Sequence, residues 1–336
     1  MATKLEISQL DFDGIKDNLK TFLSQQDEFT DYNFEGSGMN ILLDVLAYNT
    51  HYLGYNANML ANEMYLDSAD QRTSVVSLAK QVGYTPRSAT SSQATIDVVV
   101  NNASGASLTM SRGTKFTSTV DGTNYSFVSN ADVSISPSDN VYKFSNLVIY
   151  EGTYLNFKYT ANTSDTDQRF IVPNDDVDTN TLTVKVQESA SDSTTNTYTL
   201  ATGITALDST SKVFFLQEVE NGRFEVYFGD GVLGQSIKDG NIIILDYVVC
   251  NRDEANGAST FTLSGSVGGF SNVTITTIGT AAGGDDPETI KSIKYNAPRD
   301  YTAQDRAVTA DDYKVLVKSL YANAQSVQVY GGEDAA

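Results

Sequence analysis

The sequence predicts a multidomain α+β protein, with a helical N-terminal bundle segment, antiparallel β domains in the middle and a small α/β segment at the C-terminal side. Apolar residues recur at helical spacing up to residue 86, alternate with period two through the middle, and return to helical spacing near residue 313. The length of 336 residues corresponds to about two or three domains of ~150 residues. We therefore expect four ranges: 1–86, helical and bundle-forming; 87–188, a β domain; 189–284, a β domain with hairpins and an extended arm; and 285–336, an incomplete α/β segment.

The helical range contains three helix patterns. The first follows the cap candidates Asp11 and Asp13, and its apolar positions are Phe12, Ile15, Leu19, Phe22 and Leu23. A long pattern covers about residues 37–66, and a shorter one covers residues 70–82. Gly83 fits the C-terminal cap of the third helix, because glycine adopts a left-handed backbone without a steric penalty.

The middle of the chain is rich in serine and threonine, which is also typical of a disordered linker. The period-two alternation at residues 96–100 and 182–186 instead favours strands with polar exposed faces. Asp121-Gly122 and Asn221-Gly222 separate such runs and predict two-residue hairpin turns. We expect the Gly/Ser/Thr-rich stretch 257–277 to form the extended arm.

The last range returns to mixed structure. Asp285 or Asp286 caps an expected helix with Pro287 in its first turn, and this helix should stop before Pro298. Thr309 begins a capping box with Asp312 in place of the usual glutamate, which predicts a second helix. Alternation at residues 326–330 predicts a strand.

Composition excludes several functional classes. The net charge of −20 disfavours binding to nucleic acid and to anionic membrane surfaces. One cysteine, Cys250, and one histidine, His51, exclude a disulfide framework within the chain and a zinc site of four Cys/His ligands. The N-terminus lacks an apolar signal core, and no run reaches the ~18 apolar residues of a membrane span. We expect a soluble protein made in a cytoplasm, with no cofactor and no bound metal.

Two short motifs resemble ligand sites, but each lacks residues or a structural element that the site needs. Residues 229–234 match the glycine spacing of a dinucleotide-binding loop, but only residues 235–238 separate them from the next turn, too few for the required helix. We interpret Gly229, Asp230 and Gly231 as a structural turn that needs positive φ. Asp176 and Asp178 resemble the start of a calcium loop, whose glycine and final glutamate are missing.

No catalytic constellation stands out in the sequence. His51 lies within the long helical pattern, in a segment poor in acids, and no nucleophile-elbow motif is present. A pair of carboxylates for glycoside hydrolysis stays open, because the 42 acidic residues offer many pairs and nothing singles one out. We predict that the chain is not an enzyme.

The long helical pattern carries two apolar lines. One line alternates spacings of four and three residues, as a heptad seam does, and contains Ile41, Val45, Tyr48, Tyr52, Tyr55 and Met59. The other contains Leu46, Leu53 and Leu60, spaced by seven. Asp44 is the only charged residue between 36 and 62. A helix of about 30 residues is ~45 Å long, and two apolar lines need neighbours on more than one side. We predict a bundle completed by other chains; a bundle within this chain is the alternative.

Three segments carry a resemblance to a known family. Residues 296–313 resemble the signature of the baseplate J-like family, and include Arg306, Ala307, Val308, Thr309, Asp312 and Tyr313. The turn at 228–231 resembles that family's glycine turn. Residues 36–86 resemble the wedge subunit of T-even-type contractile-tailed bacteriophages. Such subunits usually continue beyond the point where this chain stops, so we expect the C-terminal part to be absent.

The resemblance implies a structural component of a contractile phage tail baseplate wedge, located in the virion and assembled in the cytoplasm of the bacterial host. It implies a dimer with a second copy, a helical bundle with another wedge protein, a ring around the hub, and docking of a small sheath-initiating subunit. The alternative is a carbohydrate- or receptor-binding phage tail surface protein. That class favours clustered aromatics, whereas the 19 tyrosines and 15 phenylalanines are spread along this chain and tryptophan is absent.

Overall fold

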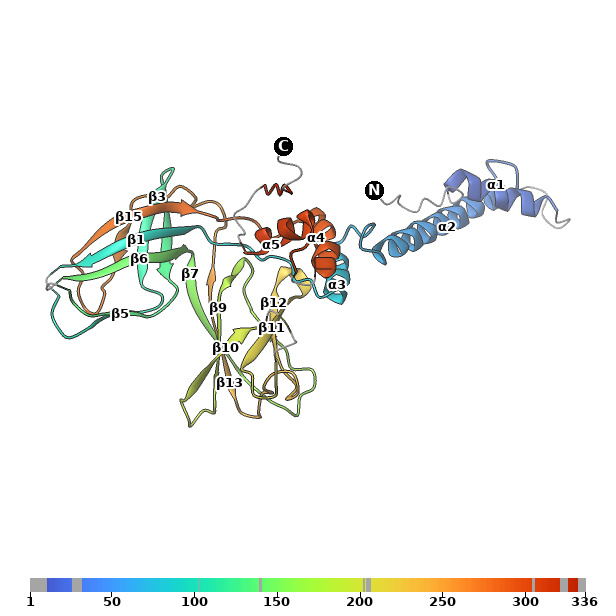
Figure 1. Ribbon diagram of the computed structural model, residues 1–336. Helices are drawn as coiled ribbons and strands as arrows, with labels where there is room; N and C mark the ends of the chain where they lie inside the picture. Colours follow the sequence, from blue (N-terminus) through green and yellow to red (C-terminus); the bar gives the residue numbers. More distant parts are fainter. Residues whose placement is uncertain are drawn as a thin grey trace.

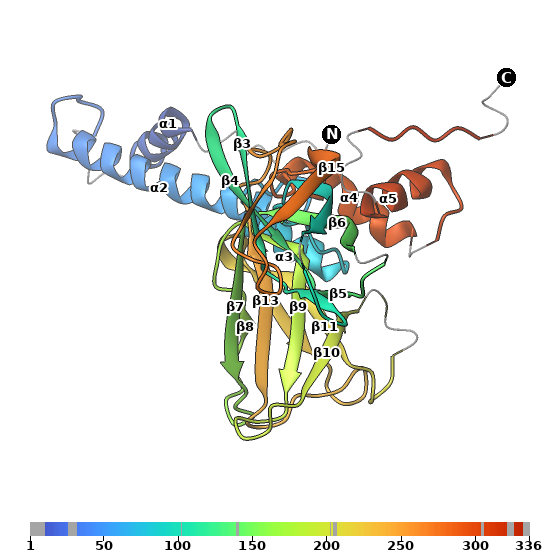
Figure 2. The ribbon, with the colours of Figure 1, turned by 90° about the vertical axis from the view of Figure 1, so that its left-hand side faces the viewer.

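The computed structural model describes residues 11–25, 32–101, 103–138, 141–201, 203, 207–303, 306–320 and 326–331. Two β-sheets form the body of the molecule, and a group of helices packs beside the seven-stranded one (Figure 1). One long helix projects away from this body with a short helix alongside it, in both views (Figures 1 and 2). The predicted α+β class is confirmed, with helices before and after a mostly antiparallel β region.

The helices begin and end close to the predicted positions at the N-terminal side. Their bounds are α1 Phe12–Leu23, α2 Gly38–Glu63, α3 Arg72–Gln81, α4 Ile290–Ala303 and α5 Ala310–Leu320. The Asp11 side chain caps α1 by accepting a hydrogen bond from the Gly14 N–H, and the Ser37 side chain caps α2 by accepting from the Asn40 N–H. Each cap satisfies a backbone N–H that the first helical turn leaves without a partner.

The first sheet has six strands in the order β14-β3-β4-β6-β1-β15. Their bounds are β14 Thr262–Ser264, β3 Lys115–Val120, β4 Thr123–Ser129, β6 Tyr142–Glu151, β1 Gln93–Val100 and β15 Val273–Ala282. A separate pair joins β2, Leu108–Met110, to β5, Val133–Ile135. β3 and β4 form the hairpin predicted at Asp121-Gly122, where both residues have positive φ, 48° and 84°.

The second sheet has seven strands in the order β7-β13-β9-β10-β11-β12-β8. Their bounds are β7 Thr153–Thr160, β13 Ile242–Val249, β9 Val177–Gln187, β10 Thr195–Leu200, β11 Val213–Glu218, β12 Phe224–Phe228 and β8 Phe170–Ile171. The predicted Asn221-Gly222 turn joins β11 to β12 and lies in a short 3₁₀ turn, η1 Glu220–Gly222. β10 and β11 pair in parallel, so the predicted antiparallel pattern has one exception.

Strand pairing divides the chain differently from the predicted β ranges 87–188 and 189–284. β7, β8 and β9 precede residue 188 but belong to the second sheet, whereas β14 and β15 follow it and belong to the first. The reason is that the chain leaves the first sheet at the end of β6 and returns after β13, so each sheet is built from two distant stretches. The domain boundaries therefore stay a prediction, and the pairing favours one unit formed by β1–β6 with β14–β15 and another formed by β7–β13.

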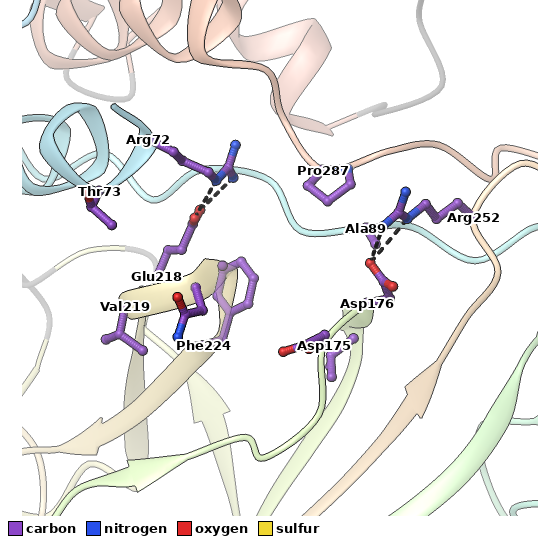
Figure 3. Close-up of a pocket in the computed structure, with 13 residues that line it drawn as sticks. Arg72, Thr73, Ala89, Asp175, Asp176, Glu218, Val219, Phe224, Arg252 and Pro287 are labelled. Carbon is purple, nitrogen blue, oxygen red and sulfur yellow. Dashed lines mark hydrogen bonds and ion pairs between the residues drawn. The ribbon is translucent and has the colours of Figure 1, made fainter. Parts of the chain in front are cut away.

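Helix α3 packs against α4 rather than against α2. Val75, Ala79, Ile293 and Ala297 are buried together in this contact. Arg72, at the start of α3, makes a two-pronged ion pair with Glu218 at the end of β11, with N–O distances of 2.7 and 2.8 Å (Figure 3). Side chains from residues far apart in the sequence thus join the helices to the second sheet.

Helix α4 differs from its prediction at both ends. It begins at Ile290 and not beside Asp286, because residues 285 and 288 pair in extended conformation with Thr90 and Arg87. It also continues through Pro298, where the prediction ends it. Proline removes one helical N–H, but buried contacts on both sides hold the helix, and the Arg299 guanidinium donates to the nearby Tyr295 carbonyl at 2.7 Å.

The predicted strand at residues 326–330 is wrong. These residues have no strand assignment, and no neighbouring strand pairs with them in the part of the chain that the structure describes. An alternating sequence forms a strand only where a neighbouring strand accepts its backbone hydrogen bonds. The last named element before residues 326–330 is the helix α5, which offers no such edge.

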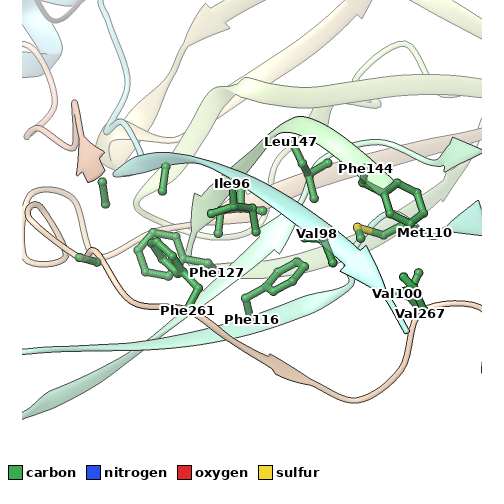
Figure 4. Packing of buried hydrophobic residues seen from close by; sticks show 14 of the residues in the cluster. Ile96, Val98, Val100, Met110, Phe116, Phe127, Phe144, Leu147, Phe261 and Val267 are labelled. Atoms are coloured by element: carbon green, nitrogen blue, oxygen red, sulfur yellow. The ribbon is translucent and has the colours of Figure 1, made fainter. Parts of the chain in front are cut away.

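The core of the first sheet lies under the segment predicted as an extended arm. Phe261 packs edge to face against Phe127 with ring centroids 5.0 Å apart, and Val267 is buried beside β1 (Figure 4). The arm prediction is therefore wrong for residues 257–272. Its few apolar side chains are enough to fold this Gly/Ser/Thr-rich segment back over the sheet, because each buried one removes apolar area from water.

The two sheets meet where β6 passes into β7. Glu151 is fully buried, and its carboxylate accepts hydrogen bonds from the Asn251 N–H and side-chain amide at 2.8 and 2.7 Å. The next residue, Gly152, has φ 128°, and a Cβ at this position would lie 2.2 Å from the Val249 carbonyl oxygen. The outgoing chain and the returning chain are thus held together by a buried carboxylate and by direct backbone packing.

Replacing Glu151 with glutamine should make stability less dependent on pH. Burial raises the pKa of Glu151 in the folded state, so the folded protein holds a proton that the unfolded chain has released. The free energy of unfolding then falls as pH rises from the usual glutamate value of 4.5 through the folded pKa. Urea unfolding across this pH range should show a shallower decrease for Glu151→Gln, and an unchanged slope would contradict the assignment.

Candidate assembly surface

Among the residues that the structure describes, contacts of the chain with helix α2 bury one narrow face of it. Ile15 of α1 packs on this face, where Leu43 and Ala47 of α2 are buried. Lys16 and Asp44 form an ion pair between the two helices. Elsewhere α2 extends beyond α1 toward the body of the molecule (Figures 1 and 2).

The two predicted apolar lines lie on the uncovered side of α2. All nine residues are exposed, with fractions between 43% for Met59 and 68% for Leu60. The set consists of Ile41, Val45, Leu46, Tyr48, Tyr52, Leu53, Tyr55, Met59 and Leu60. We call these residues the α2 surface. They do not form a core with the rest of the described chain, so the arrangement favours a partner from outside it, and the intermolecular bundle stays a prediction.

Leu42 extends the α2 surface, although the sequence reasoning did not select it. Its side chain is 58% exposed. At about 100° per residue, Leu42 lies on the same side of the helix as Leu46, Leu53 and Leu60. The signal was present in the spacing of four residues to Leu46, but the search for a strict seven-residue repeat passed over it.

Tyr48 and Tyr52 form an aromatic pair at the centre of the α2 surface. Their ring centroids are 4.6 Å apart at 63°, and the Tyr48 hydroxyl donates to the Tyr52 hydroxyl at 2.9 Å. This hydrogen bond raises the pKa of Tyr48, so its phenol stays neutral near neutral pH. The pair presents two large rings in a fixed arrangement, which lowers the entropy lost when a partner buries them.

The turn at residues 229–231 is fixed by two different constraints. Gly231 has φ 89°, as expected for a glycine turn. Gly229 is not among the positive-φ residues; instead, a Cβ there would lie 2.3 Å from the Leu233 carbonyl oxygen. Asp230 accepts hydrogen bonds from the N–H groups of Val232 and Leu233, and these bonds lower the pKa of Asp230. Residues 235–241 connect Gly234 to β13 without a helix. A dinucleotide-binding loop needs a helix at this place, so the turn is not such a loop.

Residues 306–313, the last part of the segment that resembles the baseplate J-like signature, lead into α5 and form its first turn. Thr309 N–H donates to the Asp312 carboxylate at 2.7 Å, and Asp312 N–H donates to the Thr309 hydroxyl at 3.2 Å. These reciprocal bonds make the predicted capping box and lower the pKa of Asp312. Val308 and Tyr313 are exposed, Ala307 is half-buried, and Arg306 donates its N–H to the Ala303 carbonyl at the end of α4.

A cavity of about 490 Å³ lies between α3, the β11–β12 hairpin and the segment before α4. Its two cations already have partners: Arg72 pairs with Glu218, and Arg252 pairs with Asp176 at 2.6 Å (Figure 3). No histidine, cysteine, serine or lysine lines it. The arginines of this cavity are therefore held in ion pairs that join the surrounding structural elements.

The residues considered as ligands have other roles. Asp178 is buried and accepts hydrogen bonds from the N–H groups of Ser91 and Asn180, at 2.9 and 3.0 Å. His51 lies on α2 beside Tyr52, with ring centroids 6.3 Å apart. Within the described ranges, no group of three or more His, Cys, Asp or Glu side chains is arranged to hold a metal ion. None of the helices described there has the length and apolarity to cross a membrane.

Comparisons with known proteins match the sequence of this chain to baseplate wedge proteins. The family described as "Baseplate wedge protein gp6-like, helical domain" matches residues 11–84, and "Bacteriophage baseplate wedge protein gp6, third domain" matches residues 156–256. The baseplate wedge protein gp6 of Enterobacteria phage T4 is 30% identical over 349 residues, with 95% of this chain and 51% of that protein covered. The chain thus spans about half the length of this relative.

A solved structure, the anti-feeding prophage baseplate determined by cryo-EM, also aligns with the chain. It shares 11% identity at a TM-score of 0.36, over 96% of this chain and 66% of that one. A likeness of this size carries no conclusion about fold or function.

Replacing Gly229 with alanine should destabilise the fold by about 1–3 kcal/mol, because the new methyl group would overlap backbone atoms of residues 233 and 234. Gly38→Ala is the matched control, since a Cβ there meets nothing within 4 Å and the residue lies in the first turn of α2. Thermal unfolding should show a lower midpoint for the first variant and an equal or higher one for the second. Equal midpoints would mean that the turn at 229 relaxes freely.

Proposed function

We propose that this chain, which belongs to the gp6-like family of baseplate wedge proteins over residues 11–84 and 156–256, is a structural subunit of a contractile phage tail baseplate. The observation that carries the proposal is the exposed α2 surface on a helix that projects from the body. A monomer seldom keeps so many large apolar side chains in water without a partner. The surface fits a helical bundle formed with other wedge proteins.

Burial gives the proposed bundle a sufficient driving force. Covering one Leu, Ile or Met side chain contributes about 1.5–3 kcal/mol, before the entropy of association is subtracted. Asp44 is the one charged side chain between residues 36 and 62, and it already pairs with Lys16 of α1. The partner helix therefore meets no unpaired charge on this face, and the desolvation cost stays low.

The proposed partners are a second copy of this chain, another wedge protein that contributes helices to the bundle, and a small sheath-initiating subunit. In this arrangement the two β units and the helices α3 to α5 contribute to a ring around the baseplate hub. The half-buried ion pair between Arg72 and Glu218 supports such a role, because it fixes the orientation of α3 on the second sheet.

We also propose that the chain has no enzymatic activity. The family is named for an assembly component of the baseplate. The cavity between α3 and the β11–β12 hairpin has its charged side chains paired with each other. The polar groups that the sequence suggested as ligands are bound to backbone N–H groups or arginine side chains.

Substituting Tyr48 and Tyr55 together with aspartate should abolish assembly with the other wedge proteins, because two charges would enter the bundle core. The folded body should be unaffected, since both side chains are exposed. Co-purification of the tagged chain with co-expressed wedge proteins, together with analytical ultracentrifugation, measures the effect.

Tyr48→Phe with Tyr55→Phe is the matched control for this experiment. It keeps both aromatic rings on the α2 surface, adds no charge and removes the hydrogen bond between the Tyr48 and Tyr52 hydroxyls. The control should assemble. Normal assembly of the aspartate variant would rule out the α2 surface as the contact, and equal loss in both variants would mean that the phenol hydroxyls, and not the burial of the rings, hold the contact.

A further inference from the structure

Strand β15 forms one edge of the first sheet, and β1 is the one strand that pairs with it in the described ranges of the chain (Figure 1). Proteins usually protect a sheet edge with a charge, a proline or a very short strand, because its free N–H and C=O groups attract other strands. The remaining sheet edges follow this rule: β14 has three residues, β8 has two, and β7 carries Lys158. β15 has ten residues and contains neither a charge nor a proline.

The direction of the free backbone groups follows from the pairing with β1. Asn101 N–H donates to the Asn272 carbonyl, and the register continues from Val100–Val273 to Ile96–Thr277. Since backbone groups alternate sides along an antiparallel strand, those of Val273, Ile275 and Thr277 point away from β1. In the part of the chain that the structure describes, no backbone hydrogen bond reaches them.

The free edge has defined limits. The N–H of Ala281 donates to the Ala258 carbonyl, and the Ala281 carbonyl accepts from Gly257, so the far end of β15 is already covered by this chain. The β1 register shifts between residues 277 and 279, which ends the regular alternation. The Thr277 hydroxyl donates to the Ser259 carbonyl at 2.6 Å, so the same segment of this chain also contacts the side chain of Thr277 and marks the end of the free edge. The stretch whose outward backbone groups have no partner in the described residues is therefore 273–277, five β-branched side chains in a row, the residue class with high strand propensity.

We propose that this edge pairs with the same edge of a second copy, antiparallel and two-fold symmetric about Ile275. The choice of a second copy rests on the dimer in the proposed function and on the self-complementarity of the segment. The two-fold register places Ile275 opposite Ile275, Val273 opposite Thr277 and Thr274 opposite Thr276. All three outward-facing residues gain backbone partners, and no like charges meet, as an isologous interface requires.

Burial along β15 agrees with this pairing. Val273 and Ile275 are only half-buried and lie on the core face, next to the main hydrophobic cluster. A second copy would extend the sheet and cover the exposed sides of these residues, while Thr274 and Thr276 would pair across the opposite face. The dimer thus completes a core that a single chain leaves open at its edge.

Cysteine crosslinking tests the register directly. Ile275→Cys places two thiols on the symmetry axis, with Cα atoms about 5.5 Å apart, within the range that a disulfide spans. The native Cys250 is buried and gives little background. Mild oxidation, or a short bifunctional thiol reagent, should convert Ile275→Cys into a covalent dimer. Thr280→Cys, exposed on the same strand but five residues from the axis, should stay monomeric because its symmetry mates are roughly 30 Å apart.

A mixed-chain experiment covers the case in which Ile275→Cys folds poorly. Chains with Val273→Cys and chains with Thr277→Cys should crosslink when mixed, and neither should crosslink alone. Absence of both crosslinks, or equal crosslinking of the Thr280→Cys control, would overturn the proposal. If assembly through the α2 surface persists while these crosslinks are absent, only the strand pairing fails. Protection of the 273–277 amides solely on addition of another wedge protein would assign the edge to a different partner.

Discussion

The architecture depends on the point where the chain crosses between its two sheets. Buried Glu151 holds Asn251 by two hydrogen bonds, and Gly152 allows the backbone to pass against Val249. Burying a carboxylate is costly unless its oxygens are satisfied, and here both oxygens accept. Because the outgoing and returning segments are joined at this point, each sheet can be built from two distant stretches without losing its position relative to the other.

Further polar contacts lie next to this crossing. Cys250 N–H donates to the Asp176 carbonyl, and the adjacent Arg252 pairs with the Asp176 carboxylate. Arg252 also reaches Asp286, which precedes α4. Together with the Arg72–Glu218 pair, these contacts connect both sheets to the helices α3 and α4. Polar links, some half-buried and some exposed, thus connect the second sheet to the helices of the body.

The N-terminal helices α1 and α2 differ from the body in how little of their apolar surface is buried. α2 has little charge, a narrow contact with α1 and a wide exposed apolar side. Its stability as an isolated helix rests on its length, its Ser37 cap and the packing of Leu43 and Ala47. The two sheets have buried cores of their own, whereas α2 and the β15 edge both leave groups without a partner in the described residues. This combination agrees with the assembly role proposed above.

The sequence alone determined the local features. The helix caps at Asp11 and Thr309, the turns at residues 121–122 and 221–222, and the apolar lines of α2 all involve residues within a few positions of each other. Their hydrogen bonds and backbone preferences act locally, so their patterns can be recognised without knowledge of the fold. The candidate α2 surface was accordingly selected almost completely from spacing, with Leu42 as the omission.

The tertiary structure decided what depends on distant surfaces. The pairing of β1 with β15, the folding of residues 257–272 over the first sheet, and the continuation of α4 through Pro298 each require contacts across long sequence separations. A local pattern does not encode which strand supplies the next hydrogen-bonding edge, or whether packing outweighs a missing helical N–H. The sequence identified the N-terminal helices and the main strand-forming stretches, and long-range packing determined which strands share a sheet, which edge stays open and which face remains uncovered.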